Sequence, residues 1–142
     1  MAGEQRERAF VALGSNVGDR EGHLRTALAA LGNLPGTDLI AASAIEETTP
    51  LGGMSQPPYL NQMAVLETTL PPRALLDALH DIEHQAGRVR TSRWEARTLD
   101  LDIVRYGDQR IDEPDLIIPH PGLPNRDFWL RELAELRSHE RR

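Results

Sequence analysis

Two segments with helical spacing of apolar residues interrupt a series of short β-like runs, and this order leaves few folds open. The helical segments are residues 18–34 and 71–87, and each ends near glycine or a Pro-Gly pair. The runs with strand character are residues 8–13, 39–44, 63–66 and 99–106. A last helix is predicted over residues 127–136, with Phe128, Leu130, Leu133 and Leu136 as its apolar positions.

The resulting order, strand–helix–strand–strand–helix–strand, predicts an α+β fold, a ferredoxin-like βαββαβ sandwich. Because long parallel runs are missing, we expect a mainly antiparallel sheet with both helices packed on one face. The 142 residues fit a single domain that is frayed at residues 1–7 and 138–142. Residues 46–58 hold too many prolines and glycines for regular structure, and residues 107–111 are expected to turn the last strand back as a hairpin.

The composition excludes several classes of function. With 22 acidic and 16 basic residues the net charge is −6, which argues against a general binder of nucleic acid or anionic membranes. No apolar stretch approaches the roughly 18 residues of a membrane span, and residues 1–8 do not lead into the apolar core of a secretory signal. The chain has no cysteine, so disulfide and thiolate chemistry are excluded. We expect a cytoplasmic monomer that acts on small molecules.

The sharpest chemical signal is the pair Asp100 and Asp102 in the run LDLDIVRY. Residues two apart on a strand share a face, so both carboxylates project together while Leu101 points into the core. Their Cα atoms should lie about 6.5–7 Å apart, a separation at which two carboxylates can hold one or two Mg²⁺ ions. The alternative is that the two acids merely form the solvated face of an edge strand.

The segment before the acid pair is basic in an otherwise acidic chain. Residues 88–97, RVRTSRWEAR, contain four arginines and one glutamate. Arginine binds phosphate oxygens well, so this segment has the character of a lid over phosphates. A solvated basic loop or a patch that contacts RNA would have the same composition. Trp94 within it could stack on a planar ligand or could tether the loop.

Two further polar residues are candidates for binding. Asn61 offers a donor and an acceptor to the edge of a heterocycle, or it caps a turn. His120, between two prolines, could donate to a phosphate or occupy a surface loop. Neither a P-loop nor a dinucleotide-binding glycine motif is present, and no Ser-His-Asp order or zinc spacing is visible.

Seven motifs in the same order resemble the 6-hydroxymethyl-7,8-dihydropterin pyrophosphokinases of folate synthesis. They are VALGSN at 11–16, TTPLG at 48–52, QPPYLN at 56–61, EHQAGRVR at 83–90, RW at 93–94, RTLDLD at 97–102 and PHP with NRDF between 119 and 128. They span nearly the whole chain, and RTLDLD preceded by RW is the most specific of them. The resemblance implies a ferredoxin-like enzyme that transfers pyrophosphate from ATP to the pterin hydroxymethyl group and releases AMP.

The resemblance also implies a role for each matched residue. Two Mg²⁺ ions would be held by Asp100 and Asp102. The catalytic group would be Arg88, Arg97, Asp100 and Asp102. The pterin would be bound by Thr48, Leu51, Tyr59, Asn61, Trp94 and Phe128. The nucleotide would be bound by Glu83, Arg90, Trp94, Arg97, Ile103, His120 and Arg126.

At three positions the sequence departs from the family pattern. His80, Asp115 and Ile117 stand where relatives have other nucleotide-contacting side chains, so no role is transferred to them. Two alternatives stay open from the sequence: a ferredoxin-like RNA-binding module that uses the arginines and Trp94, and an allosteric domain that binds a small ligand without catalysis.

Overall fold

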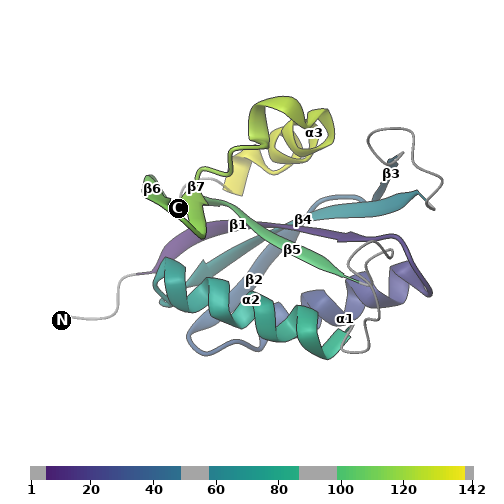
Figure 1. Cartoon of the computed structure of the whole chain (residues 1–142), viewed down its shortest axis with the longest axis horizontal. Helices are drawn as coiled ribbons and strands as arrows, with labels where there is room; N and C mark the ends of the chain where they lie inside the picture. Colours follow the sequence, from purple (N-terminus) through teal and green to yellow (C-terminus); the bar gives the residue numbers. More distant parts are fainter. Residues whose placement is uncertain (1–5, 49–57, 87–98, 140–142) are drawn as a thin grey trace.

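The computed structural model describes residues 6–48, 58–86 and 99–139 as a five-stranded sheet with helices on both faces (Figure 1). The strands of this sheet are β1 (Glu7–Ser15), β2 (Thr37–Ala42), β3 (Glu46–Thr48), β4 (Tyr59–Thr68) and β5 (Asp100–Tyr106). The helices are α1 (Arg20–Gly32), α2 (Pro72–Ala86) and α3 (Asp127–Glu135), with short 3₁₀ helices η2 (Leu123–Asn125) and η3 (Arg137–His139). A separate two-stranded sheet consists of β6 (Ile111–Glu113) and β7 (Leu116–Ile118).

The strand order is β2-β4-β1-β5, and β3 also pairs with β4. Every pairing is antiparallel, so β1 and β2 run parallel to each other on either side of β4. Helix α1 connects β1 to β2, and α2 connects β4 to β5. Crossovers of this kind are right-handed as a rule, which places both helices on the same face of the sheet, and side chains of both belong to one apolar cluster. The prediction of a ferredoxin-like α+β fold is confirmed.

Each face of the sheet has its own apolar core. On the face of α1 and α2, a cluster forms around Val11, Leu13, Leu24, Leu31, Leu66, Leu75 and Leu79. On the opposite face, α3 packs Trp129, Leu133 and Leu136 against Phe10, Met63 and Val65. Leu130 was expected to lie on the buried, apolar side of the last helix, but it is 44% exposed. Glu132, on the same helix, is only 1% exposed. None of the helices in the described ranges combines the length and apolar character needed to cross a bilayer.

A β-bulge in β5 changes the expected alternation of side chains. Phe10 pairs with Arg105 and Val11 with Ile103, so Val104 is an extra residue on β5. Up to Ile103 the alternation holds, and Leu101 and Ile103 belong to the core under α1 and α2. Val104 itself joins the core under α3, and beyond the bulge Tyr106 returns to the core under α1 and α2. The acid pair therefore projects on the face that carries α3.

Several local expectations were wrong. β3 lies within the segment expected to be irregular, because Glu46–Thr48 pairs with the start of β4. Residues 107–111 do not return along β5; instead β6 pairs with β7 in the small sheet. The chain does turn there, at Gly107 with φ of +53°. Regular structure also extends into both ends that were expected to fray, since β1 begins at Glu7 and η3 covers Arg137–His139.

Candidate functional site

The central strand β1 fixes the place of the acid pair. Ala12 pairs with Asp102 and Gly14 with Asp100, and directly opposed residues of an antiparallel pair project on the same face. Ala12 belongs to the core under α3, so both carboxylates point to that side. Both acids are partly exposed, with 41% of the Asp102 side chain open to solvent. Two carboxylates, which are hard oxygen ligands, therefore lie on a part of the sheet that a solute can reach.

His120 faces the acid pair in a fixed orientation. Its Nε2 lies 3.7 Å from Oδ1 of Asp102, and its Nδ1 accepts a hydrogen bond of 2.9 Å from the Gly122 amide. Because Nδ1 is the acceptor, the neutral ring carries its proton on Nε2, toward the acid. The backbone amide of His120 donates to the carbonyl of Val104, and the ring meets Trp129 edge-on at 4.9 Å. The imidazole is thus a preset donor beside the acid pair.

A cavity of about 400 Å³ lies between α2, β5 and the small sheet. Five residues assigned by resemblance line it: Glu83, Asp100, Asp102, Ile103 and His120. The three positions that depart from the family pattern, His80, Asp115 and Ile117, line the same cavity. Asp115 also pairs with Arg73 of α2 at 2.9 Å, and this partner lowers the pKa of Asp115. The structure therefore places both expected metal ligands and three of the expected nucleotide residues around one hollow, whereas Arg126 is not among the residues that line it.

Glu83 supports the outer edge of the sheet at this cavity. Among the described strands β5 lies at the edge of the sheet, and the Leu101 amide donates to Oε2 of Glu83 at 2.7 Å in place of a further strand. Burial raises the pKa of Glu83, the bond from Leu101 lowers it, and the nearby charge of Asp100 raises it again. Leu101 lies between the two acids, so Glu83 anchors the strand that carries them.

Replacing Glu83 separates its role as an acceptor from its charge. Glu83→Ala leaves the Leu101 amide without a partner, whereas Glu83→Gln keeps an oxygen in reach. We expect Glu83→Ala to have a free energy of unfolding about 1–3 kcal/mol below that of Glu83→Gln. Urea denaturation at pH 7 measures the difference. Equal stability of the two variants would show that the bond to Leu101 contributes nothing.

Three of the residues expected to bind the pterin, Thr48, Tyr59 and Asn61, lie across β1 from the acid pair. Asn61 on β4 pairs with Gly14 on one side and Glu46 on the other, and Thr48 pairs with Tyr59. The amide of Asn61 donates to Oγ1 of Thr48 at 2.6 Å, which orients the side chain. Asn61, Gly14 and Asp100 form one row across three strands.

The start of α3 adds a group of rings, of which only Phe128 was expected at the site from the sequence. The Arg126 guanidinium lies 4.4 Å from the centre of the Trp129 ring, and Phe128 meets the same ring at 6.2 Å. Trp129 also holds His120, yet it was given no role from sequence. Its i, i+4, i+7 spacing with Leu133 and Leu136 was the signal for this buried stripe. Leu51, Arg88, Arg90, Trp94 and Arg97 lie outside the described residues.

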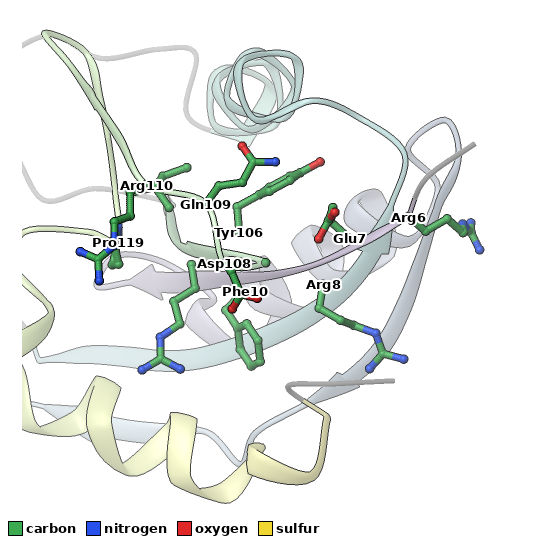
Figure 2. A pocket seen from close by; sticks show the side chains of 12 residues that line it. Arg6, Glu7, Arg8, Phe10, Tyr106, Asp108, Gln109, Arg110 and Pro119 are labelled. Carbon is green, nitrogen blue, oxygen red and sulfur yellow. The ribbon is translucent and has the colours of Figure 1, made fainter. Parts of the chain in front are cut away.

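A second cavity, of about 420 Å³, lies near the N-terminal end of β1. Four arginines line it, but they do not converge. Figure 2 shows Arg110 beside Pro119 on one side and Arg6 and Arg8 on the other. Arg6 pairs with Asp38 at 3.1 Å, and Arg8 donates to the His139 carbonyl at 2.9 Å. We therefore assign the candidate site to the cavity that holds the acid pair.

The chain is similar over most of its length to one family of known proteins. The family model described as 7,8-dihydro-6-hydroxymethylpterin-pyrophosphokinase matches residues 10–138. A Pseudomonas aeruginosa protein named 2-amino-4-hydroxy-6-hydroxymethyldihydropteridine pyrophosphokinase is 46% identical over 130 residues, 92% of this chain and 80% of that protein. Proteins of the same name from Haemophilus influenzae and Bacillus subtilis are 45% and 42% identical, over 92% and 90% of this chain and 81% and 77% of their own.

Proposed function

Because this chain belongs to the 7,8-dihydro-6-hydroxymethylpterin-pyrophosphokinase family, we propose how its own residues carry out the reaction of that family. The enzyme transfers pyrophosphate from ATP to the hydroxymethyl group of 6-hydroxymethyl-7,8-dihydropterin and releases AMP, a step of folate biosynthesis. Such transfers leave little covalent work for side chains, so positioning and charge stabilisation carry most of the catalysis.

We assign the metal site to Asp100 and Asp102. Mg²⁺ prefers oxygen ligands and is usually held by one or two carboxylates together with substrate phosphates. Two carboxylates side by side on an accessible sheet face fit that donor set, and two ions are proposed there. When bound, magnesium neutralises phosphate charge and makes the hydroxyl of the acceptor easier to deprotonate.

The side chains around the acid pair have complementary tasks. His120 presents its Nε2–H toward Asp102, where it can hold the carboxylate or a phosphate oxygen. Ile103, Glu83 and Arg126 are proposed to border the nucleotide. Arg88 and Arg97 are proposed to stabilise the transferring phosphates, with Arg90 and Trp94 closing over the site. Support for the arginines is their place in the sequence, directly before the strand of the acid pair.

The pterin is proposed to bind on the other side of β1. Asn61 and Thr48 offer polar edges for its ring, and Tyr59 and Phe128 offer flat surfaces, with Leu51 completing the slot. The observation that carries this assignment is the row Asn61, Gly14 and Asp100, which places a candidate heterocycle binder beside a candidate metal ligand. An acceptor hydroxyl held at one end of this row can reach phosphates held at the other.

Incubation with MgATP and the hydroxymethyl-dihydropterin tests the activity directly. We expect AMP and the pterin diphosphate to form in equal amounts, and we expect both to disappear when EDTA removes the metal. Formation of ADP, or AMP without the pterin diphosphate, would contradict the proposed transfer. We further propose that the enzyme works in the cytoplasm, where ATP is available, as a monomer that does not act on nucleic acid.

A further inference from the structure

The geometry points to Gly14 as a specificity-determining residue. Because Gly14 has no side chain, the hydroxymethyl arm of the substrate can lie directly on its backbone as it runs from Asn61 toward Asp100. This inference rests on the proposed function and adds a residue to it. Gly14 lies on the central strand β1 and pairs with both of those residues. Neighbouring strands are about 4.8 Å apart, so Gly14 is the one position that separates the two binding groups in this row.

The space above Gly14 opens toward the proposed pterin residues. A Cβ atom built on it would lie 3.4 Å from Oδ1 of Asn61 and 3.5 Å from Cδ1 of Tyr59. Its third neighbour, the carbonyl oxygen of Leu60, would be 3.9 Å away. These are ordinary van der Waals distances, so the protein by itself has room for a methyl group here.

The backbone does not require glycine at this position. The described glycines with positive φ are Gly18, Gly36 and Gly107, and Gly14 is not among them. Glycine weakens a strand interior relative to alanine, because it loses more conformational freedom on folding. In such a place it commonly marks a close approach of a ligand or of another backbone. The nearest described atoms stay 3.4 Å or more from that position, so a ligand atom can approach the backbone there.

A methyl group at Gly14 would lift a flat substrate off the sheet. Carbon atoms make contact at about 3.5–4.0 Å, so a ring or a CH₂ arm resting on bare backbone has to move when a Cβ is added. Displacement by about 1 Å at a reacting centre can reduce the rate by roughly 10²-fold. The side chain would stand beside Asn61 and Tyr59, so acceptor binding is affected and nucleotide binding is not.

The test is Gly14→Ala, which should raise the stability of the protein and lower its activity with the pterin. We expect the melting temperature to rise by about 1–4 °C. We expect kcat/KM for the pterin to fall by roughly 10- to 100-fold, and the pterin dissociation constant, measured by fluorescence titration, to rise. The dissociation constant for MgATP alone should stay within twofold of the parent enzyme.

Gly32→Ala is the matched control. Gly32 ends α1 without a positive φ, and its Cβ would also meet a neighbour at 3.4 Å, the Cβ of Leu39. This variant should keep the parent's pterin kinetics. An unchanged kcat/KM for Gly14→Ala would overturn the inference, and so would a lower melting temperature, since the protein itself would then need the glycine. If the parent enzyme released no AMP, the proposed function itself would fail instead.

Discussion

Asp102→Asn will lower the rate of pyrophosphate transfer by about 10²–10³-fold, the usual loss when one charge-stabilising contact is removed from a transition state. The substitution keeps the size of the side chain and removes its charge. Asp102 is partly exposed and lies in no apolar cluster, so the fold should not change. Asp100→Asn is expected to act in the same way, because it removes the neighbouring ligand on the same strand face.

The loss should be visible in binding as well as in rate. Titration calorimetry with ATP should detect magnesium-dependent uptake for the parent protein and a much weaker signal for Asp102→Asn. Asp108→Asn is the control, since Asp108 is an exposed acid beyond the far end of β5 and lines the other cavity. Normal AMP release by Asp102→Asn, with its circular dichroism spectrum unchanged, would remove the acid pair from the mechanism.

The sequence predicts the elements of this fold well because their signals are local. The repeat of Leu24, Ala27 and Leu31 marks the buried face of α1, and Leu75 and Leu79 mark that of α2. Turn residues such as Gly107 mark where the chain reverses. These features depend on neighbours a few residues away, so a single sequence contains them.

Strand pairing is not a local property, and for this reason the predicted return of residues 107–111 along the last strand was wrong. Whether Ile111 returns along β5 or pairs with Ile118 depends on the packing of the whole sheet. The bulge at Val104 likewise arises from the pairing of β5 with β1. Without it, Val104 would still face α3, but Tyr106 would point to that side as well and would leave the core under α1 and α2 that it occupies.

The candidate site shows the same division. The acid pair stands out in the sequence because its two members are two residues apart on one strand. Asn61 and Asp100 are distant in sequence, and only the position of β1 between their strands explains why they form one row. Gly14 belongs to the VALGSN motif, but nothing in the sequence places it in that row beyond its position at a strand end. The roles of these residues stay predictions that the variants above test.

Glu132 is the residue that most clearly breaks the usual rule for charged side chains. It lies on the buried face of α3, is 1% exposed, and neither carboxyl oxygen has a hydrogen-bond partner among the described residues. The pKa of Glu132 is raised to about 8, chiefly by burial and then by the charge of Glu46, while Arg131 lowers it and Glu135 raises it by smaller amounts. The carboxyl is therefore mostly protonated in the folded protein at neutral pH.

This pKa makes the stability of the fold depend on pH. The ordinary pKa of a glutamate is 4.5, so the folded state binds the proton more tightly than the unfolded state. The stabilising contribution is complete below pH 4.5, declines as the pH rises, and is lost once the pH passes about 8. By linkage, the free energy of unfolding falls by on the order of 3–5 kcal/mol across this window.

Glu132→Gln should remove that decline. We expect the variant to match the parent near pH 5 and to exceed its free energy of unfolding at pH 9 by on the order of 2–4 kcal/mol. Urea denaturation at a series of pH values measures this. Glu21→Gln, which changes an exposed glutamate in the first turn of α1, should keep the parent's pH dependence.

The same ionisation reaches the candidate site through α3. The helix that buries Glu132 also begins with Phe128 and Trp129, and Trp129 packs on His120. Ionised Glu132 would place a charge in the interface under α3 and would weaken the packing of the helix that holds these rings. The thermal half-life of activity at pH 9 should therefore be longer for Glu132→Gln than for the parent. Parallel pH profiles of stability for the two proteins would mean that Glu132 finds a partner or solvent when it ionises, and α3 would not be pH-sensitive.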